Sequence, residues 1–231
     1  MKLSHKIGKL VSGETYARSR RKLRRKLFPV QVPPLLAQID QGRLREIQKH
    51  YASSSLNYAK YADVERWLKR HVKHIQDLQL HRSPPQEVLD LGCGGGFFLF
   101  VAKQFGHCVV GLDIDEFPLF RELLTLFEVP RTVWMIQPFQ ALPDFGYKFD
   151  WITAFSTRFN RDREDRNVWH VPEWNYFLDD LQRHLKPGGK VFLEINSGKS
   201  KRYYPPEVRE LFVSRGASLE RENVYFPKGP L

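Results

Sequence analysis

From residue 86 onward, short apolar runs alternate with segments in which apolar side chains recur at helical spacing. Short apolar runs predict buried strands, and a recurrence near 3.6 residues predicts helices. The predicted strands are 88–91, 108–112, 132–136, 149–155, 190–195 and 218–226, and the predicted helices are 97–105, 120–127, 174–185 and 206–215. Strands that alternate with helices form βαβ units, so we expect an α/β fold with a doubly wound, mostly parallel sheet and helices on both faces.

Proline and serine clusters divide the chain into three parts. Residues 1–33 form a basic arm, residues 34–85 a helical extension, and residues 86–231 the α/β domain. Two tyrosines of the extension, Tyr58 and Tyr61, are candidates for a lid over a ligand, although packing is the simpler role for both.

The positive charge of the chain is concentrated in the arm. Residues 1–30 hold ten basic side chains and one acidic one, a net charge of +9 within the +11 of the whole chain. Leu23, Leu27 and Phe28 interrupt the densest run of Arg and Lys. Leucines interleaved with cations favour an anionic membrane surface as the partner of residues 1–30. A nucleic acid ranks second because stacking aromatics are few, and a transit segment or a solvated tail also fits the pattern.

Cysteine content excludes several classes of site. The chain has two cysteines, Cys93 and Cys108. Two thiols exclude a disulfide scaffold, a four-thiolate zinc site and an iron–sulfur cluster, and we expect no metal. Two cysteines also suit a reducing compartment, so we expect a cytoplasmic protein, peripheral on a membrane if the arm binds lipid. No apolar stretch in the sequence is long enough to span a bilayer.

The densest chemical signal is the glycine-rich loop Asp90-Leu-Gly-Cys-Gly-Gly-Gly96, between the first strand and the first helix of the domain. Such a loop lets a ligand approach the backbone closely. Asp113 ends the neighbouring strand, where its carboxylate can accept hydrogen bonds from two ribose hydroxyls. A dinucleotide fingerprint would place glycine where Phe97 stands, and a P-loop would place Ser or Thr where Val191 stands. The loop therefore predicts a nucleoside-like ligand.

These landmarks resemble the Rossmann-like (class I) S-adenosylmethionine-dependent methyltransferases over residues 86–226. The matching segments are 88–96, 111–114, 142–143 with 149–150, and 185–189. The resemblance implies S-adenosylmethionine as cofactor. The site residues that it implies are Asp90 beneath the loop, Gly92, Gly94 and Gly96 against the methionine part and ribose, Asp113 on the ribose hydroxyls, and Ile114 on the adenine.

The sequence departs from the family pattern at two places. The acid that often contacts the adenine amino group falls at Pro138, so Gln137 or Gln140 would replace it. Five residues follow Phe226, so the last antiparallel strand is expected to be missing or short.

Several acceptor classes are disfavoured by missing motifs. The fourth strand leads into Phe155-Ser-Thr157 rather than the Asn/Asp-Pro-Pro-aromatic motif of enzymes that methylate base amino groups. Neither cysteine is placed to attack a pyrimidine, and the acids of metal-dependent catechol-type enzymes are absent. We therefore expect in-line methyl transfer to a small-molecule or glycan-type acceptor. The alternatives are an RNA or protein methyltransferase guided by the arm, and a non-enzymatic adaptor.

Substrates of such sheets lie over the carboxyl ends of the strands. The connections expected there are cationic and aromatic, which suits an anionic or sugar-like acceptor. Arg158, Arg202 and Tyr203 are the candidate substrate contacts. His170 is the candidate general base because the usual pKa of histidine is near neutrality.

Overall fold

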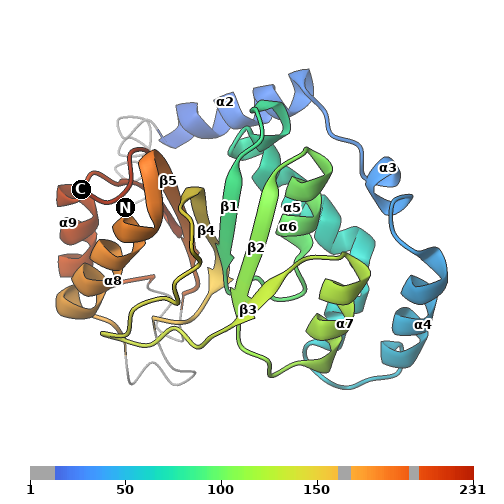
Figure 1. The fold of residues 1–231 in the computed structure, drawn as a ribbon. Coiled ribbons are helices and arrows are strands. Elements are labelled where there is room, and N and C mark those ends of the chain that lie inside the picture. The colour runs from blue at the N-terminus through green and yellow to red at the C-terminus, as the bar shows by residue number, and fades with distance from the viewer. Residues whose placement is uncertain (1–13, 161–167, 198–202) are drawn as a thin grey trace, which may run out of the picture.

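The computed structural model describes residues 14–160, 168–197 and 203–231 of the chain. Its centre is a seven-stranded sheet in the order β3-β2-β1-β4-β5-β7-β6 (Figure 1). The strands are β1 (Glu87–Leu91), β2 (Cys108–Asp113), β3 (Arg131–Val133), β4 (Phe149–Thr157), β5 (Leu185–Ile195), β6 (Ser218–Glu220) and β7 (Asn223–Phe226). Strands β1 to β5 pair in parallel, whereas β7 is antiparallel to both β5 and β6.

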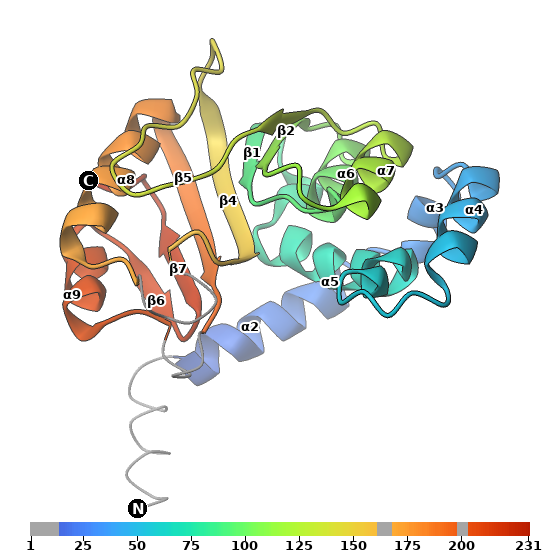
Figure 2. The same ribbon diagram turned by 90° about the horizontal axis from the view of Figure 1, so that it is seen from below.

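Helices cover both faces of the sheet, as the alternation of strands and helices predicted. On one side lie α5 (Val64–Asp77), α6 (Phe97–Gln104) and α7 (Pro118–Leu126), and on the other α8 (Val171–His184) and α9 (Pro206–Ser214), as Figures 1 and 2 show. Each side has its own hydrophobic cluster. The doubly wound, mostly parallel α/β fold is confirmed.

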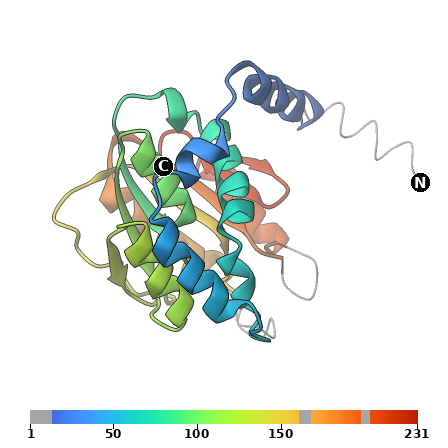
Figure 3. The ribbon, with the colours of Figure 1, turned by 90° about the vertical axis from the view of Figure 1, so that its right-hand side faces the viewer.

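The N-terminal helices lie on the α5 side of the sheet. They are α2 (Glu14–Leu27), α3 (Val32–Leu36) and α4 (Gln41–Tyr51), followed by the short 3-10 turns η1 (Ala59–Ala62) and η2 (Leu80–Arg82). Helix α4 contacts α7, and α2 and α3 contact α5 (Figure 3). The anchor of this layer is α5, which buries Val64, Leu68, Val72 and Ile75. None of the helices among the described residues is both long and apolar enough to cross a membrane.

The last strand corrects the sequence prediction. The expected single strand 218–226 is wrong, because the chain reverses at residues 221–222 into the hairpin of β6 and β7. Arg221 adopts a positive φ of 53° at this reversal. Strand β7 inserts between β5 and β6 and has four residues. The final antiparallel strand is therefore present, in the short form.

Three element boundaries also differ from the predictions. Strand β3 ends at Val133, three residues before the predicted end. Strand β5 begins at Leu185, five residues before the predicted start, because Leu185 already pairs with Phe149 of β4 before a shift in register. Helix α8 begins three residues before Trp174. The Glu173 carboxylate accepts a hydrogen bond from the His170 N–H at 2.9 Å, which caps that first turn.

Gly111 on β2 is required by close packing against the glycine-rich loop. A Cβ at this position would overlap Cys93 Sγ and lie 3.1 Å from Leu99 Cδ1. We predict that Gly111→Ala lowers the free energy of unfolding by about 1–3 kcal/mol, as overpacking of a core does. Urea denaturation measures this loss.

The contact with Cys93 is tested by a double-mutant cycle. Cys93→Ala removes the overlapping sulfur, so the double variant should lose less stability than the sum of the two single variants. Strictly additive losses would show that Cys93 is not the obstacle.

Candidate functional site

A cavity of about 750 Å³ opens at the carboxyl ends of β1, β2 and β4. Its walls come from the glycine-rich loop, the end of β2, residues 134–136 after β3, the end of β4 and the first half of α5. Parallel strands bring their carboxyl ends to one edge of a sheet, which explains why these distant segments meet. This edge is where the sequence placed the ligand.

The glycine-rich loop follows β1 in a conformation that favours glycine. Gly92 has a φ of +68°, and a Cβ there would lie 2.7 Å from Thr157 Cγ2. Gly96 has a φ of +75° and is the N-cap of α6. Gly92 and Gly94 line the cavity, whereas Gly96 is buried against Leu124 behind it. The loop thus presents bare backbone to a ligand, and Gly96 supports the turn rather than the ligand.

Asp113 lines the cavity at the end of β2. Its carboxylate accepts hydrogen bonds from the Gly94 N–H at 2.5 Å and the Ile114 N–H at 2.7 Å. Burial raises the pKa of Asp113, and these two backbone donors oppose that rise. The carboxylate is thereby held beside the loop with lone pairs left to accept from a bound ligand. Ile114, the next residue, also lines the cavity.

Asp90 lies beneath the loop at the floor of the cavity. It is 3% exposed, and its carboxyl accepts a hydrogen bond from Thr153 Oγ1 at 2.7 Å. Burial raises the pKa of Asp90 to about 8, and the nearby charge of Asp113 adds to the rise. A neutral carboxylic acid at this place avoids repulsion between the two acids.

Helix α5 contributes a face that the sequence analysis missed. Trp67, Arg70 and His71 recur at helical spacing on α5 and line the cavity. The Arg70 guanidinium donates to Ser156 Oγ and to Glu194 Oε1, both at 2.7 Å. The i, i+3, i+4 spacing of these residues was the available signal, but the sequence alone does not show which face of α5 turns toward the loop.

Tyr61 also lines the cavity, with its ring stacked on Trp67 at a centroid distance of 4.4 Å. Tyr58 packs instead against Phe117 and Tyr51 and is not among the lining residues. Of the two tyrosines considered for a lid, one therefore reaches the cavity.

His71 places an uncharged imidazole in the cavity wall. Burial lowers the pKa of His71 well below its ordinary value, and the neighbouring His74 and Arg70 lower it further. The ring is stacked on Phe97, and its Nδ1 atom is buried without a hydrogen-bond partner among the described residues. The same burial that keeps this imidazole uncharged also makes it a weak base.

Two predicted site residues lie away from the cavity, and their predicted roles are corrected. His170 is exposed at the N-cap of α8, with its Nδ1 atom 3.0 Å from Glu207 Oε1. Gln137 is exposed, and its side chain contacts Met135 Sδ rather than the cavity. Residues 134–136 line the cavity instead, because β3 ends early and the following segment runs across the opening.

The predicted substrate contacts separate in the structure. Arg158 is exposed and lines the cavity, directly after β4. Tyr203 is half-buried near Arg221 and does not line it. Arg202 lies outside the described residues. Among the described residues, no group of three or more His, Cys, Asp or Glu side chains is arranged to hold a metal ion.

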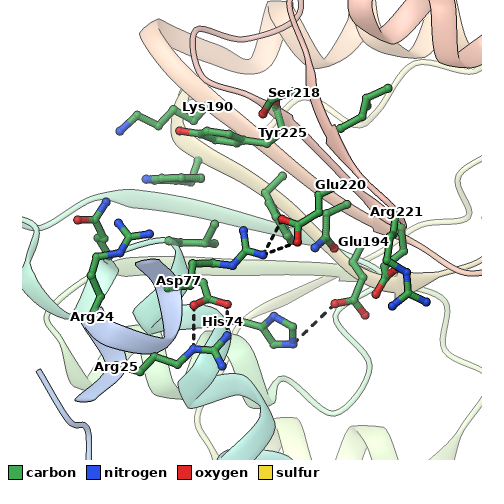
Figure 4. A pocket seen from close by; sticks show the side chains of 18 of the residues that line it. Arg24, Arg25, His74, Asp77, Lys190, Glu194, Ser218, Glu220, Arg221 and Tyr225 are labelled. Carbon is green, nitrogen blue, oxygen red and sulfur yellow. Dashed lines mark hydrogen bonds and ion pairs between the residues drawn. The ribbon is translucent and has the colours of Figure 1, made fainter. Parts of the chain in front are cut away.

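A second cavity of about 790 Å³ lies between α2, the end of α5 and the β5–β7–β6 part of the sheet. Ion pairs cross it, and Lys190 and Tyr225 lie together on its sheet side (Figure 4). No glycine is among its described lining residues, and two of its carboxylates, Asp77 and Glu220, are in ion pairs with Arg25 and Arg21. The first cavity is therefore the candidate site.

The raised pKa of Asp90 predicts a pH-dependent stability. Between its ordinary value of 3.8 and about 8, the folded chain keeps a proton that the unfolded chain has lost. The free energy of unfolding contributed by Asp90 therefore falls as pH rises through this window, by at most about 1.4 kcal/mol per pH unit. Asp90→Asn keeps an acceptor for Thr153 and has no such proton. Its stability relative to the wild type should increase from about pH 5 to about pH 7 in urea denaturation, and a pH-independent difference would contradict the protonated state.

Residues 88–189 match the family described as "Methyltransferase domain". The "Ubiquinone biosynthesis O-methyltransferase" of Pseudomonas aeruginosa (strain LESB58) is 31% identical over 120 residues, 51% of this chain and 47% of the relative. The "Cycloartenol-C-24-methyltransferase" of Arabidopsis thaliana is 32% identical over 125 residues, 52% of this chain and 34% of the relative.

This chain thus spans about half the length, or less, of the curated relatives that it matches. Among solved structures, the PH0226 protein from Pyrococcus horikoshii OT3 is similar in fold, with a TM-score of 0.50 at 20% identity, covering 73% of this chain and 94% of that one. The match over 88–189 includes the glycine-rich loop and Asp113. Residues 88–189 of this chain are therefore similar to a methyltransferase domain, and they lie within a Rossmann-like sheet.

Proposed function

We propose that the protein transfers the methyl group of S-adenosylmethionine to a hydroxyl of a small-molecule or glycan-type acceptor. The observation that carries this proposal is the meeting, in one cavity, of the glycine-rich loop, the Asp113 carboxylate and the neutral His71. The name of the Pseudomonas relatives, an O-methyltransferase, supports oxygen as the acceptor atom.

The residues of the cavity fit the cofactor. The loop offers close backbone approach at Gly92 and Gly94, and Asp113 offers carboxylate oxygens for the ribose hydroxyls. Ile114 lies next to Asp113, where it would pack on the adenine. The cavity volume of about 750 Å³ lies in the upper part of the range of ordinary ligand pockets. A cavity of this size suits a cofactor with an acceptor beside it.

When bound, S-adenosylmethionine supplies an electrophilic methyl group on a sulfonium, so the protein must align a nucleophile and remove its proton. His71 lines the cavity, and we assign it the acceptor proton. Its lowered pKa makes it a weak base, so it suits an acceptor hydroxyl whose own pKa is low. It replaces His170, which lies outside the cavity. Arg158 remains the candidate contact for an anionic or sugar-like acceptor, because it is an exposed cation on the cavity lining.

Asp113 provides the direct test of cofactor binding. We predict that Asp113→Ala weakens S-adenosylmethionine binding by about 10- to 100-fold in calorimetry, the loss expected for a charged hydrogen-bond acceptor. Glu128→Gln is the control, because Glu128 is an exposed acid whose side chain is 83% accessible. Equal affinity of the wild type and Asp113→Ala would refute the assigned ribose contact. Absence of binding by the wild type would favour the adaptor.

His71 provides the test of chemistry. We predict that His71→Gln lowers kcat by about 10²- to 10⁴-fold, as loss of a general base does, with little change in cofactor affinity. His170→Gln, outside the cavity, should retain full activity. Activity is measured as transfer of a labelled methyl group into a metabolite extract. Unchanged kcat in His71→Gln would remove the assigned base.

The fraction that gains label identifies the acceptor class. Label in the small-molecule or glycan fraction is expected. Label in RNA or protein would instead support a macromolecular acceptor and overturn the proposed class.

A further inference from the structure

Helix α2 is fastened to the body through arginines that face inward. The Arg21 guanidinium donates to both oxygens of Glu220, at 2.7 and 2.5 Å, and Arg25 Nε donates to Asp77 Oδ1 at 2.8 Å (Figure 4). These pairs join α2 to the β6–β7 hairpin and to the end of α5. Two cations of the arm are therefore used within the protein and are not free for a partner.

The opposite face of α2 is apolar at its centre and cationic at its flanks. Leu23 and Leu27 are 56% and 60% exposed. Lys26 and Arg20 are exposed beside them. Residues 19–28 contain no acidic side chain. We call this set the outer face of α2.

This orientation is the reverse of an ordinary surface helix, which buries its leucines and exposes its charges. Here two leucines one turn apart point away from the core while two arginines point into it. A helix of this kind gains stability when its apolar residues enter a medium that also attracts its cations. The interface of a bilayer with anionic headgroups is such a medium.

We propose that the outer face of α2 binds the surface of an anionic lipid bilayer. Leu23 and Leu27 enter the interface, and Arg20 and Lys26 contact the headgroups. A nucleic acid fits this face less well, because the most exposed side chains at its centre are leucines, which offer nothing to phosphates, and because Arg21 and Arg25 are paired internally. Three further lysines, Lys2, Lys6 and Lys9, precede α2 in the sequence and add to the positive charge of the arm.

The outer face and the cofactor cavity have no residue in common. Arg25 contacts α5 at Asp77, whereas the cavity is lined by α5 residues up to His71. Membrane attachment is therefore separable from cofactor binding, and the two proposals fail independently.

The experiment measures flotation of the full-length chain with vesicles. Vesicles of equal parts phosphatidylcholine and phosphatidylglycerol should bind the wild type at low salt, and pure phosphatidylcholine should not. High salt should weaken binding, because it screens the cations. Leu23→Ser/Leu27→Ser and, separately, Arg20→Ser/Lys26→Ser should each weaken binding at least tenfold. The estimate comes from the burial of two leucines or the attraction of two cations.

The matched control is Leu56→Ser/Val213→Ser, which removes two apolar side chains with similar exposures of 50% and 51% far from α2 in the sequence. It should bind vesicles as the wild type does. Calorimetry with S-adenosylmethionine checks that each variant is folded, and its affinity should not change.

Three outcomes would overturn the proposal. They are no binding of the wild type to the anionic vesicles, equal binding by Leu23→Ser/Leu27→Ser, and an equal loss in the control variant. Salt-sensitive retention on RNA that ignores the leucines, together with no vesicle binding, would identify a nucleic acid as the partner.

Discussion

The parallel pairing of β1 with β2 is the constraint on which the site depends. Its register sets Asp90 opposite Gly111 and Leu91 opposite Leu112, so the two strands end side by side. The loop after β1 therefore begins next to Asp113, and the Gly94 N–H reaches that carboxylate. Gly111 allows the glycine-rich loop to pack closely on β2, because a side chain at this position would overlap Cys93. Backbone pairing and a missing Cβ together bring the glycine-rich loop and Asp113 to one edge of the cavity.

Electrostatics in the cavity follow from burial. Asp90 is held as a neutral acid beneath the loop, and His71 is held as a neutral base in the opposite wall. Both states result from the cost of placing charge in a poorly solvated space. The neutral Asp90 places no second charge beside Asp113, and burial keeps His71 uncharged while it weakens the imidazole as a base. The same burial that stabilises the fold thus sets the protonation states of both groups.

The positive charge of the chain is distributed unevenly between the arm and the rest of the chain. Most of the +11 belongs to residues 1–30, yet the structure turns Arg21 and Arg25 inward to carboxylates of the body. What remains outside is a smaller cationic face around two leucines. The site itself uses few cations, Arg70 and Arg158 among them. Overall basicity therefore describes the arm and not the cavity.

The sequence by itself determined the alternation of strands and helices, because that alternation depends on local hydrophobic pattern. It also determined that the glycine-rich loop, Asp90, Asp113 and Ile114 lie at one cavity, because parallel strands bring their carboxyl ends to one edge of a sheet. Only the tertiary structure decided that His71 and Arg70 line the cavity, that His170 and Gln137 do not, and that residues 218–226 form a hairpin. It also decided which face of α2 is outward. These outcomes depend on the rotation of helices and on ion pairs between residues up to 199 positions apart, which no local pattern encodes.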